Sequence, residues 1–204
     1  TSHHIGIHRL PSILKAYRQQ YPDVHLQLHF IDSEHAIHTV MQDDCDIAIT
    51  TLPATLLNSD DGSSHIQYHP LWKDPMQMVV GQQHPLQKKK TVNLADLSQH
   101  PAILPDLETR TTQLVQTLFS TSKKPLTISM TSNHLDAIKM MVAVGLGWSA
   151  LPESLIDDSL HILPIKNGRI VRELGCIHHR HRTLSNAARA MLSCLKKTAN
   201  TESS

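Results

Sequence analysis

Apolar and polar positions at the start of the chain predict a helix followed by a strand. A polar segment, Thr1–His4, leads into apolar residues three and four positions apart, the stripe of one helix: Leu10, Ile13, Leu14, Tyr17 and Tyr21. After Tyr21-Pro22-Asp23, apolar and polar residues alternate from Val24 to Phe30, as in a strand. Ser2, His3 and His4 would then lie at a helix start, where free N–H groups and the helix dipole favour an anion or a polar ligand, although an ordinary N-cap has the same pattern.

The same order of elements occurs twice along the chain. In the first copy, the strand is followed by a polar cap at Ser33, a helix over Ala36–Met41 and a strand over Asp46–Thr51. In the second copy, a strand over Leu126–Met130 is followed by polar residues, a helix ending at Gly145 and a strand over 148–152. Such short links predict parallel βαβ units, and the repeat predicts two lobes with one plan.

The remaining segments predict how the chain connects these lobes. Ala102–Leu104 and Leu160–Pro164 predict short strands, and a helix begins after Glu108–Thr112. Ile170–His178 is a long extended run, Leu184-Ser185-Asn186 begins a closing helix, and Asn58–Ser64 is a polar loop. A second lobe that begins near Val79 requires the run around Arg172 to cross back. We therefore expect lobe I at 1–78 and 173–204, lobe II at 79–172, and two crossing strands as a hinge.

Composition excludes several function classes. Lys plus Arg number 19 and Asp plus Glu 18, the net charge is +1, and aromatic residues make up 3%. A nucleic-acid surface needs basic patches and stacking aromatic residues, so we expect no DNA contact through these residues. The chain has neither an apolar run of eighteen residues nor a signal peptide pattern, which indicates a cytoplasmic protein without a membrane partner.

Cysteines and histidines are the side chains that could carry redox or metal chemistry. Three cysteines without CxxC spacing indicate reduced thiols, with a redox-sensing pair as the alternative. Two pairs among the 16 histidines, His4 with His8 and His179 with His181, have spacings that suit a metal, but neither has a third ligand at a typical spacing. We therefore expect no metal and no cofactor. GxSxG, HExxH, CxxC and GxGxxG are absent, so we also expect no enzyme.

Several short motifs, in their order and spacing, carry a family resemblance over nearly all of the chain. They are Leu10-Pro11, Tyr21-Pro22-Asp23-Val24, Asp46-Ile47-Ala48-Ile49, Val79-Val80, His84-Pro85-Leu86, Leu94-Ala95-Asp96-Leu97, Val142-Ala143-Val144-Gly145-Leu146-Gly147, Leu151-Pro152, Leu184-Ser185 and Ala187-Ala188-Arg189. Together they resemble the C-terminal effector-binding domain of the LysR family of bacterial transcriptional regulators.

The resemblance implies a fold and a binding site. The fold is that of a type 2 periplasmic binding protein: two Rossmann-like α/β lobes joined by two crossing strands, with an effector in the cleft. Carried over residue by residue, the effector-binding residues are Ser2, His3, His4, Ser33, Thr50, Thr51, Thr109, Arg110, Ser132, Asn133 and His134. They coincide with the helix starts and strand ends described above, where open α/β sheets bind ligands. Arg110 and the adjacent histidines favour an anion.

The chain also departs from the family pattern. Family members carry an N-terminal winged helix-turn-helix and a linker helix, and their domain begins with a short strand just before the position of Thr1. These parts are absent from this sequence, so we expect an excised piece whose first lobe lacks an edge strand.

The resemblance implies a regulatory function, and three other functions remain as alternatives to it. A small, anionic or polar effector would change the angle between the lobes and re-space DNA-binding domains, and promoter DNA would be contacted only through those absent domains. Family members pair side by side as homodimers and assemble into homotetramers. The alternatives are a periplasmic solute-binding protein of a transporter, an enzyme, and a dimerisation module without a ligand.

Overall fold

The computed structural model describes residues 1–53, 65–166 and 168–202 in two compact units. Unit 1 comprises Thr1–Lys73 and Glu173–Ser204, and unit 2 comprises Asp74–Arg172. Strands β2 (Ile66–Gly81) and β7 (Ile170–His179) each contain residues of both units, so the chain passes between the units twice. The lobe limits inferred from the sequence stay a prediction, and the expected loop at 58–64 lies outside the described residues.

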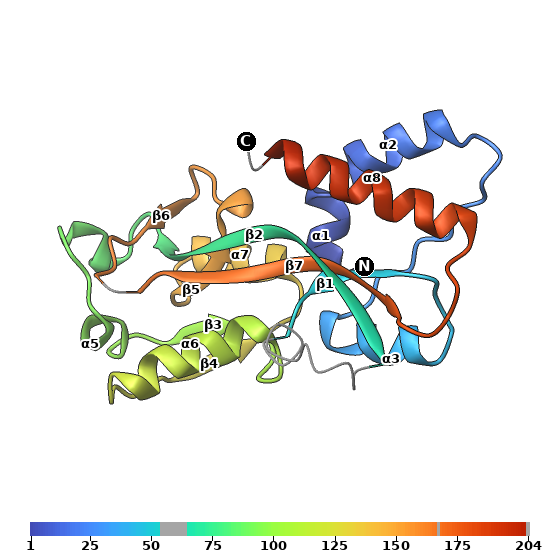
Figure 1. Cartoon of the computed structure of the whole chain (residues 1–204). Helices are drawn as coiled ribbons and strands as arrows, with labels where there is room; N and C mark the ends of the chain where they lie inside the picture. Colours follow the sequence, from blue (N-terminus) through green and yellow to red (C-terminus); the bar gives the residue numbers. More distant parts are fainter. Residues whose placement is uncertain (54–64, 167, 203–204) are drawn as a thin grey trace. The chain divides into compact units, whose positions relative to one another are not determined.

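Three helices build one side of unit 1. The predicted first helix is in fact two, α1 (His3–His8) and α2 (Pro11–Gln20), because Pro11 has no N–H to continue α1 and instead begins a new helix. Helix α2 packs against the closing helix α8 (Asn186–Glu202), and the Tyr17 hydroxyl donates a hydrogen bond to the Ala187 carbonyl at 2.9 Å (Figure 1). The apolar faces of these helices share one buried cluster with Leu174 and Cys176 of β7.

The strand predicted for Val24–Phe30 does not form. Within the described ranges, residues 24–30 pair with no strand, and the backbone bonds that reach this segment from a distant residue come from Thr1. The Thr1 amino group donates to the His29 carbonyl (2.8 Å), and the Ile31 N–H donates to the Thr1 carbonyl (2.9 Å). A strand requires a neighbour along its length to satisfy its backbone groups, and one residue supplies only two bonds. The predicted parallel βαβ unit over Val24–Thr51 is therefore wrong.

An open groove of about 340 Å³ lies beside this segment. We call it the unit-1 groove. It is bordered by residues 24–29 and 44–49 and by α2 and α8, and its apolar side chains include Leu14, Val24, Leu26, Ile47, Ile49 and Met191. β1 (Ala48–Thr51), which begins at the border of this groove, pairs antiparallel with β7, from Ala48 opposite Ile177 to Thr51 opposite Leu174. Next to β1 lie the short helices η1 (Ser33–His35) and α3 (Ala36–Met41).

Unit 2 forms both strands and the helix that the repeat predicts over 126–152, with a further strand between the two. β3 (Ala102–Leu104) and β4 (Ile128–Thr131) are parallel and are connected by α6 (Arg110–Thr121). β5 (Ser149–Pro152) and β6 (Leu160–Ile162) pair antiparallel with β2, and an isolated parallel bridge between Ala102 and Trp148 connects the two groups of strands. β2 runs without interruption from Ile66 to Gly81.

Two further helices complete unit 2, and the first of them is the helix predicted to end at Gly145. α7 (Leu135–Ala143) ends before Gly145, whose φ of +89° is the left-handed conformation that a glycine adopts after a helix. α5 (Leu94–Leu97) begins with a capping box between Asn93 and Asp96. Single 3₁₀ turns, η2 (Pro85–Lys88) and η3 (Glu153–Leu155), lie in the connections.

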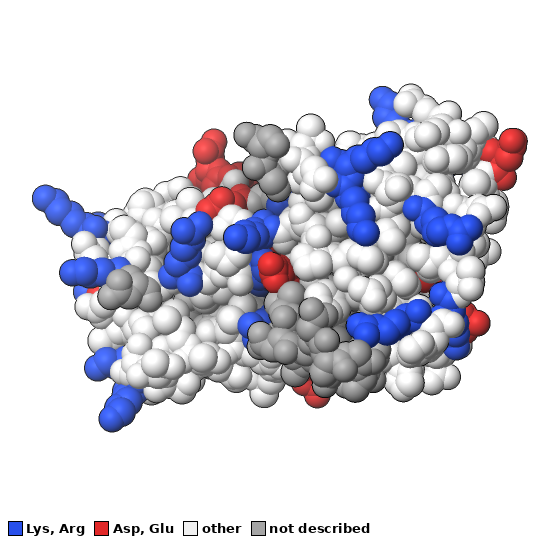
Figure 2. Space-filling model, viewed as in Figure 1, with Lys and Arg blue, Asp and Glu red and all other residues white. Residues whose placement is uncertain are grey.

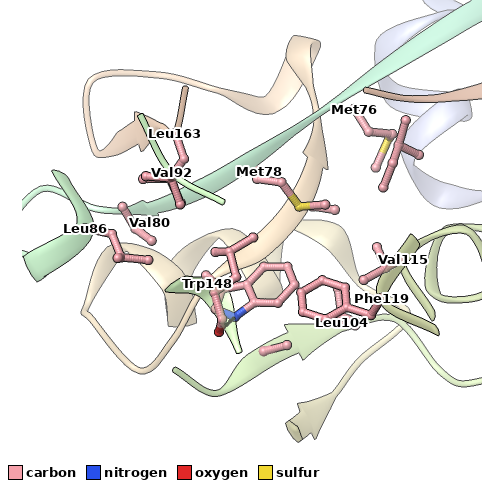
Figure 3. Packing of buried hydrophobic residues seen from close by; sticks show 14 residues of the cluster. Met76, Met78, Val80, Leu86, Val92, Leu104, Val115, Phe119, Trp148 and Leu163 are labelled. Atoms are coloured by element: carbon pink, nitrogen blue, oxygen red, sulfur yellow. Dashed lines mark hydrogen bonds between the residues drawn. The ribbon is translucent and has the colours of Figure 1, made fainter. Parts of the chain in front are cut away.

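The core of unit 2 is built around Trp148, which is fully buried (Figure 3). Its ring stacks on Phe119, with 5.6 Å between the ring centroids and 13° between the ring planes. Its indole N–H is within 3.1 Å of the carbonyls of Leu97 and His100, so the only polar atom of this side chain is satisfied. Met78 and Leu104 border the same rings. None of the described helices is both long and apolar enough to cross a membrane.

Candidate functional site

In unit 1, the structure brings three predicted site residues together at the end of β1. The Thr50 hydroxyl donates to the Ser33 carbonyl at 3.3 Å, and the Thr51 N–H donates to the Ser33 hydroxyl at 3.5 Å. Thr50 is buried, whereas Ser33 and Thr51 are half-buried. Because Ser33 begins η1, a strand end and a helix start meet here, with the Ser33 hydroxyl at the backbone N–H of Thr51.

The polar residues at the start of α1 differ in their exposure and in their contacts. Ser2 is the N-cap of α1 and makes no side-chain capping bond. His3 is exposed and its ring meets the edge of Phe30, with centroids 5.5 Å apart. The His4 ring is buried beside His8, with centroids 4.9 Å apart. Of the two adjacent histidines that the sequence places at this helix start, only His3 is therefore open to solvent in unit 1.

In unit 2, the start of α6 is a capped helix terminus with a basic residue in its first turn. Thr109 is the N-cap: its hydroxyl accepts a bond from the Thr112 N–H (3.3 Å) and donates to the Asp106 carbonyl (2.8 Å). The Thr112 hydroxyl donates to the Pro105 carbonyl at 2.7 Å. Arg110 is half-buried, and its side chain has neither a hydrogen bond nor an ion pair with the described residues. Its guanidinium is available to a carboxylate or phosphate.

The start of α7 lies beside the start of α6. Ser132 and Asn133 follow β4, and His134 is the N-cap of α7. The Ser132 hydroxyl accepts a bond from the His134 N–H at 3.2 Å. The Asn133 side chain accepts from the Asp106 N–H (3.1 Å) and donates to the Asp106 carboxylate (3.0 Å). Since β3 and β4 are parallel, the segments after them emerge at the same edge of the sheet.

Asp106 connects these two helix starts, and sequence reasoning missed it. Its carbonyl accepts from Thr109, while its N–H and carboxylate bond Asn133. The available signal was its position directly after Pro105 at the end of a short buried strand, where an Asp commonly begins a turn. Thr109, Ser132, Asn133 and His134 are thus held together in unit 2 by a residue outside the predicted set.

Histidines also form close groups on β2 and β7 within unit 1. The Nε2 atoms of His69 and His178 are 3.1 Å apart, and burial lowers the pKa of His69 to about 4, with Lys196 and His178 adding to the shift. His65, His179 and His181 are ring neighbours at 5.6 to 6.2 Å between centroids. Among the described residues, however, no group of three or more His, Cys, Asp or Glu side chains is placed to hold a metal ion.

The three cysteines, all described, are free. Burial raises the pKa of the Cys176 thiol to about 12, and burial also raises the pKa of Cys45. Both side chains are therefore thiols rather than reactive thiolates near neutral pH.

Charged side chains are scattered over the one face that Figure 2 shows. On the face drawn in Figure 2, lysine and arginine side chains are separated by wide uncharged areas and by acidic residues. The charges on this face do not form the continuous basic surface with which a protein contacts DNA.

Sequence comparison identifies relatives of the whole domain. The LysR substrate binding domain family matches residues 1–200. A probable RuBisCO transcriptional regulator of Synechocystis sp. is 30% identical over 197 residues, which is 92% of this chain and 55% of that protein. The chain thus spans little more than half the length of this relative.

Solved structures show the same fold. The CcmR regulatory domain of Synechocystis PCC6803, in complex with 2-PG, has a TM-score of 0.80 at 22% identity and covers 93% of this chain and 90% of its own. The effector-binding domain of QuiR, in complex with shikimate, has a TM-score of 0.84 at 19% identity and covers 98% and 94%. The predicted fold class, two α/β lobes of the type 2 periplasmic binding protein kind, is confirmed by these structures. The match over residues 1–200 shows that the chain belongs to the LysR substrate binding domain family of transcriptional regulators.

Proposed function

We propose that the chain is the effector-sensing domain of a LysR-type DNA-binding regulator that acts in the cytoplasm. Its effector would be a small anionic or polar molecule that contacts residues of both units. The proposed contacts are those expected from the sequence: Ser2, His3, His4, Ser33, Thr50, Thr51, Thr109, Arg110, Ser132, Asn133 and His134.

The observation that carries this proposal is that several of these residues lie together within each unit. In unit 2, Asp106 holds the starts of α6 and α7 together, and Arg110 adds a guanidinium to the first turn of α6. In unit 1, Ser33 lies against Thr50 and Thr51. Backbone N–H groups at helix starts, hydroxyls and one arginine are the donors that recognise a carboxylate or phosphate.

A ligand that contacts both units would favour the relative arrangement in which its contacts are complete. The equilibrium between the arrangements then shifts toward that one by the ratio of the ligand's affinities for the two. DNA-binding domains attached to this domain in a full-length regulator would be re-spaced as a result. The relatives named as transcriptional regulators support regulation over solute transport.

Ligand-dependent thermal unfolding tests the binding site. The probes are benzoate, shikimate and 2-PG, with which solved relatives form complexes. A ligand at a hundred times its dissociation constant should add about 2.7 kcal/mol to the free energy of unfolding. Arg110→Ala and Thr51→Val should each remove at least about 1.4 kcal/mol of this gain, which is a tenfold loss of affinity.

Ser120→Ala is the matched control because Ser120 is exposed near the other end of α6. The control should keep the full ligand-induced gain. A probe that stabilises the wild type and both site variants equally would bind elsewhere and would contradict the proposed site. If none of the probes stabilises the wild type, a site for these anions is excluded.

Exposed apolar side chains support self-association as a homodimer, and as a homotetramer in the full-length protein. In unit 1 they are Ile7, Leu28 and Phe30, and in unit 2 they are Met140, Val144 and Leu146, with exposed fractions between 46% and 65%. The Phe30 ring lies against Gly6, the neighbour of Ile7 in the chain, so exposed apolar groups of α1 and of the segment before η1 lie close together. Exposed apolar residues that gather in this way are typical of protein interfaces.

Sedimentation of charge-bearing variants tests this surface. Phe30→Asp and Val144→Asp should each shift the protein toward monomer, because a carboxylate would be buried without a partner. Ile162→Asp is the control, since Ile162 is similarly exposed but belongs to β6, an element that carries none of these six residues. A dimer that survives both Phe30→Asp and Val144→Asp would exclude this interface.

A further inference from the structure

A buried ion pair joins β2 to β7 inside unit 2. Two donors of the Arg172 guanidinium converge on one carboxylate oxygen of Asp74: Nε at 3.1 Å and the second terminal nitrogen at 2.5 Å. The two side chains are only 8% and 2% exposed. Removing a charged group this far from water is unfavourable unless its partner is fixed in place, so the geometry of this pair is tightly constrained.

The same guanidinium bonds the first turn of α6. The remaining terminal nitrogen of Arg172 donates to the Thr111 hydroxyl at 2.9 Å, and Thr111 is 1% exposed. Thr111 follows Thr109 and Arg110 in the chain, so the hydroxyl that Arg172 holds is one turn or less from both proposed effector contacts. All three nitrogens of the guanidinium are thus used by Asp74 and Thr111.

The position of this network in the chain is unusual. Asp74 is the first residue of unit 2 and Arg172 is its last, so each lies where a strand leaves the unit. Both passages of the chain between the units are therefore tied to one guanidinium, and that guanidinium is tied to the start of α6.

We propose that Asp74 and Arg172 are positioning residues that fix the first turn of α6 to the two connecting strands. This inference rests on the proposed function, in which Thr109 and Arg110 contact the effector. A displacement of α6 on effector binding would then be passed through Thr111 and Arg172 to β2 and β7 at the points where they enter unit 2. An apolar pair could fill the same volume but would not provide the directed hydrogen bonds that join β7 to β2 and to α6.

Hydrogen exchange of the first turn of α6 tests this role without any ligand. The reporters are the amides of Thr112 and Gln113, whose acceptors are the hydroxyl and the carbonyl of Thr109. Thr111→Val keeps the side-chain shape and the ion pair but removes the bond to Arg172. It should accelerate exchange of these two amides at least tenfold, and Thr111→Ser should restore the wild-type rate.

Thr117→Val is the matched control on the same helix, because the Thr117 hydroxyl is exposed and bonds the Gln113 carbonyl of its own helix. It should leave the reporter amides unchanged. The double variant Asp74→Leu with Arg172→Met replaces the pair by apolar side chains, and it should reproduce the exchange of Thr111→Val in a folded protein. A purely structural role predicts the same acceleration for all amides of unit 2, and that result, or unchanged reporters, would overturn the proposal.

A binding measurement tests whether the network affects the effector site. With benzoate as the probe, Thr111→Val should weaken binding at least tenfold although Thr111 is buried and has no access to the ligand. Equal affinity of Thr111→Val and Thr117→Val would overturn the positioning role. If the wild type binds no probe, the proposed function fails, but the exchange measurement still decides whether the network holds α6.

Discussion

Unit 1 and unit 2 contain similar sequence patterns, yet only unit 2 forms both strands and the helix of its pattern, as β4, α7 and β5. In unit 2, β4 pairs in parallel with β3, and Ala102 of β3 also forms a parallel bridge with Trp148 just before β5, so β3 lies between the two strands of the pattern. In unit 1, the alternating segment from Val24 borders the unit-1 groove, and among the described residues its distant hydrogen-bonding neighbour is Thr1, at one end. The comparison shows that alternation marks a segment able to be a strand, while a neighbouring strand decides whether it becomes one.

The largest expected effect comes from a substitution in the core of unit 2. Trp148→Ala should lower the free energy of unfolding by about 3–5 kcal/mol, because it removes the ring stacked on Phe119 and leaves a cavity. Urea denaturation measures the loss. The protein has two tryptophans, so Trp72 of unit 1 becomes the sole tryptophan reporter in this variant.

If the units unfold independently, Trp72 fluorescence in this variant should change at a higher urea concentration than the circular dichroism signal from the whole chain. A loss below about 1 kcal/mol would contradict the central place of Trp148 in this core.

The second-largest effect concerns unit 1, in which the strand predicted for Val24–Phe30 does not form. Adding a short alternating Val and Thr segment before Thr1 should raise the free energy of unfolding by about 2 kcal/mol, the gain for burying one to two Val-sized side chains in the unit-1 groove. The Thr1 backbone already bonds His29 and Ile31 in the pattern of a parallel bridge, which directs such an extension along residues 24–29. Thermal denaturation measures the gain. A Gly-Ser extension of equal length should give none, and equal melting temperatures would refute the groove as a strand site.

The third effect compares how the units respond to acid. The pKa of His69 in unit 1 is about 4 in the folded protein and about 6.5 in the unfolded chain, so between these values the unfolded state binds more protons. Stability should therefore fall as the pH is lowered from 6.5 toward 4, by about 1–2 kcal/mol after a reduction for the partial exposure of this ring.

His69→Gln should flatten this part of the pH profile of the melting temperature. In unit 2, burial next to His100 also lowers the pKa of His84, so His84→Gln should have an effect of the same sign. An unchanged profile for His69→Gln would show that this ring does not contribute.

The smallest effect should be the same in both units. Asn93→Ala removes the capping box of α5 in unit 2, and Ser185→Ala removes the bond from the Ala188 N–H (3.1 Å) at the start of α8 in unit 1. Each should cost about 0.5–1 kcal/mol because a cap depends only on its own first turn. Chemical denaturation measures both. A much smaller loss for Ser185→Ala would indicate that the difference between the units extends to local interactions.

Local signals predicted most of unit 2 and the last helix. Ala102–Leu104, the helix start at Thr109 and the left-handed glycine after α7 depend on neighbouring residues in the chain, and all were predicted. The break at Pro11 was also a local signal, but the apolar stripe that continues across it concealed the boundary. The missing strand of unit 1 depends on a partner, which no periodicity within Val24–Phe30 reports.

The same distinction explains the candidate site. The hydroxyl and amide residues at helix starts are marked by local cap chemistry, so sequence reasoning selected them. Asp106, which holds two of these starts together, and the pair of Asp74 with Arg172 act between segments 27 and 98 residues apart. Spacing along the chain contains no signal for contacts at such separations, and they became visible only in three dimensions.

The ion pair at the limits of unit 2 has a consequence for protein engineering. Unit 2 is one uninterrupted stretch, so a gene fragment for residues 74–172 would encode both members of the pair at its two ends. The two ends of that fragment would lie side by side in the folded unit, whereas unit 1 consists of two stretches and would need a designed turn from Lys73 to Glu173.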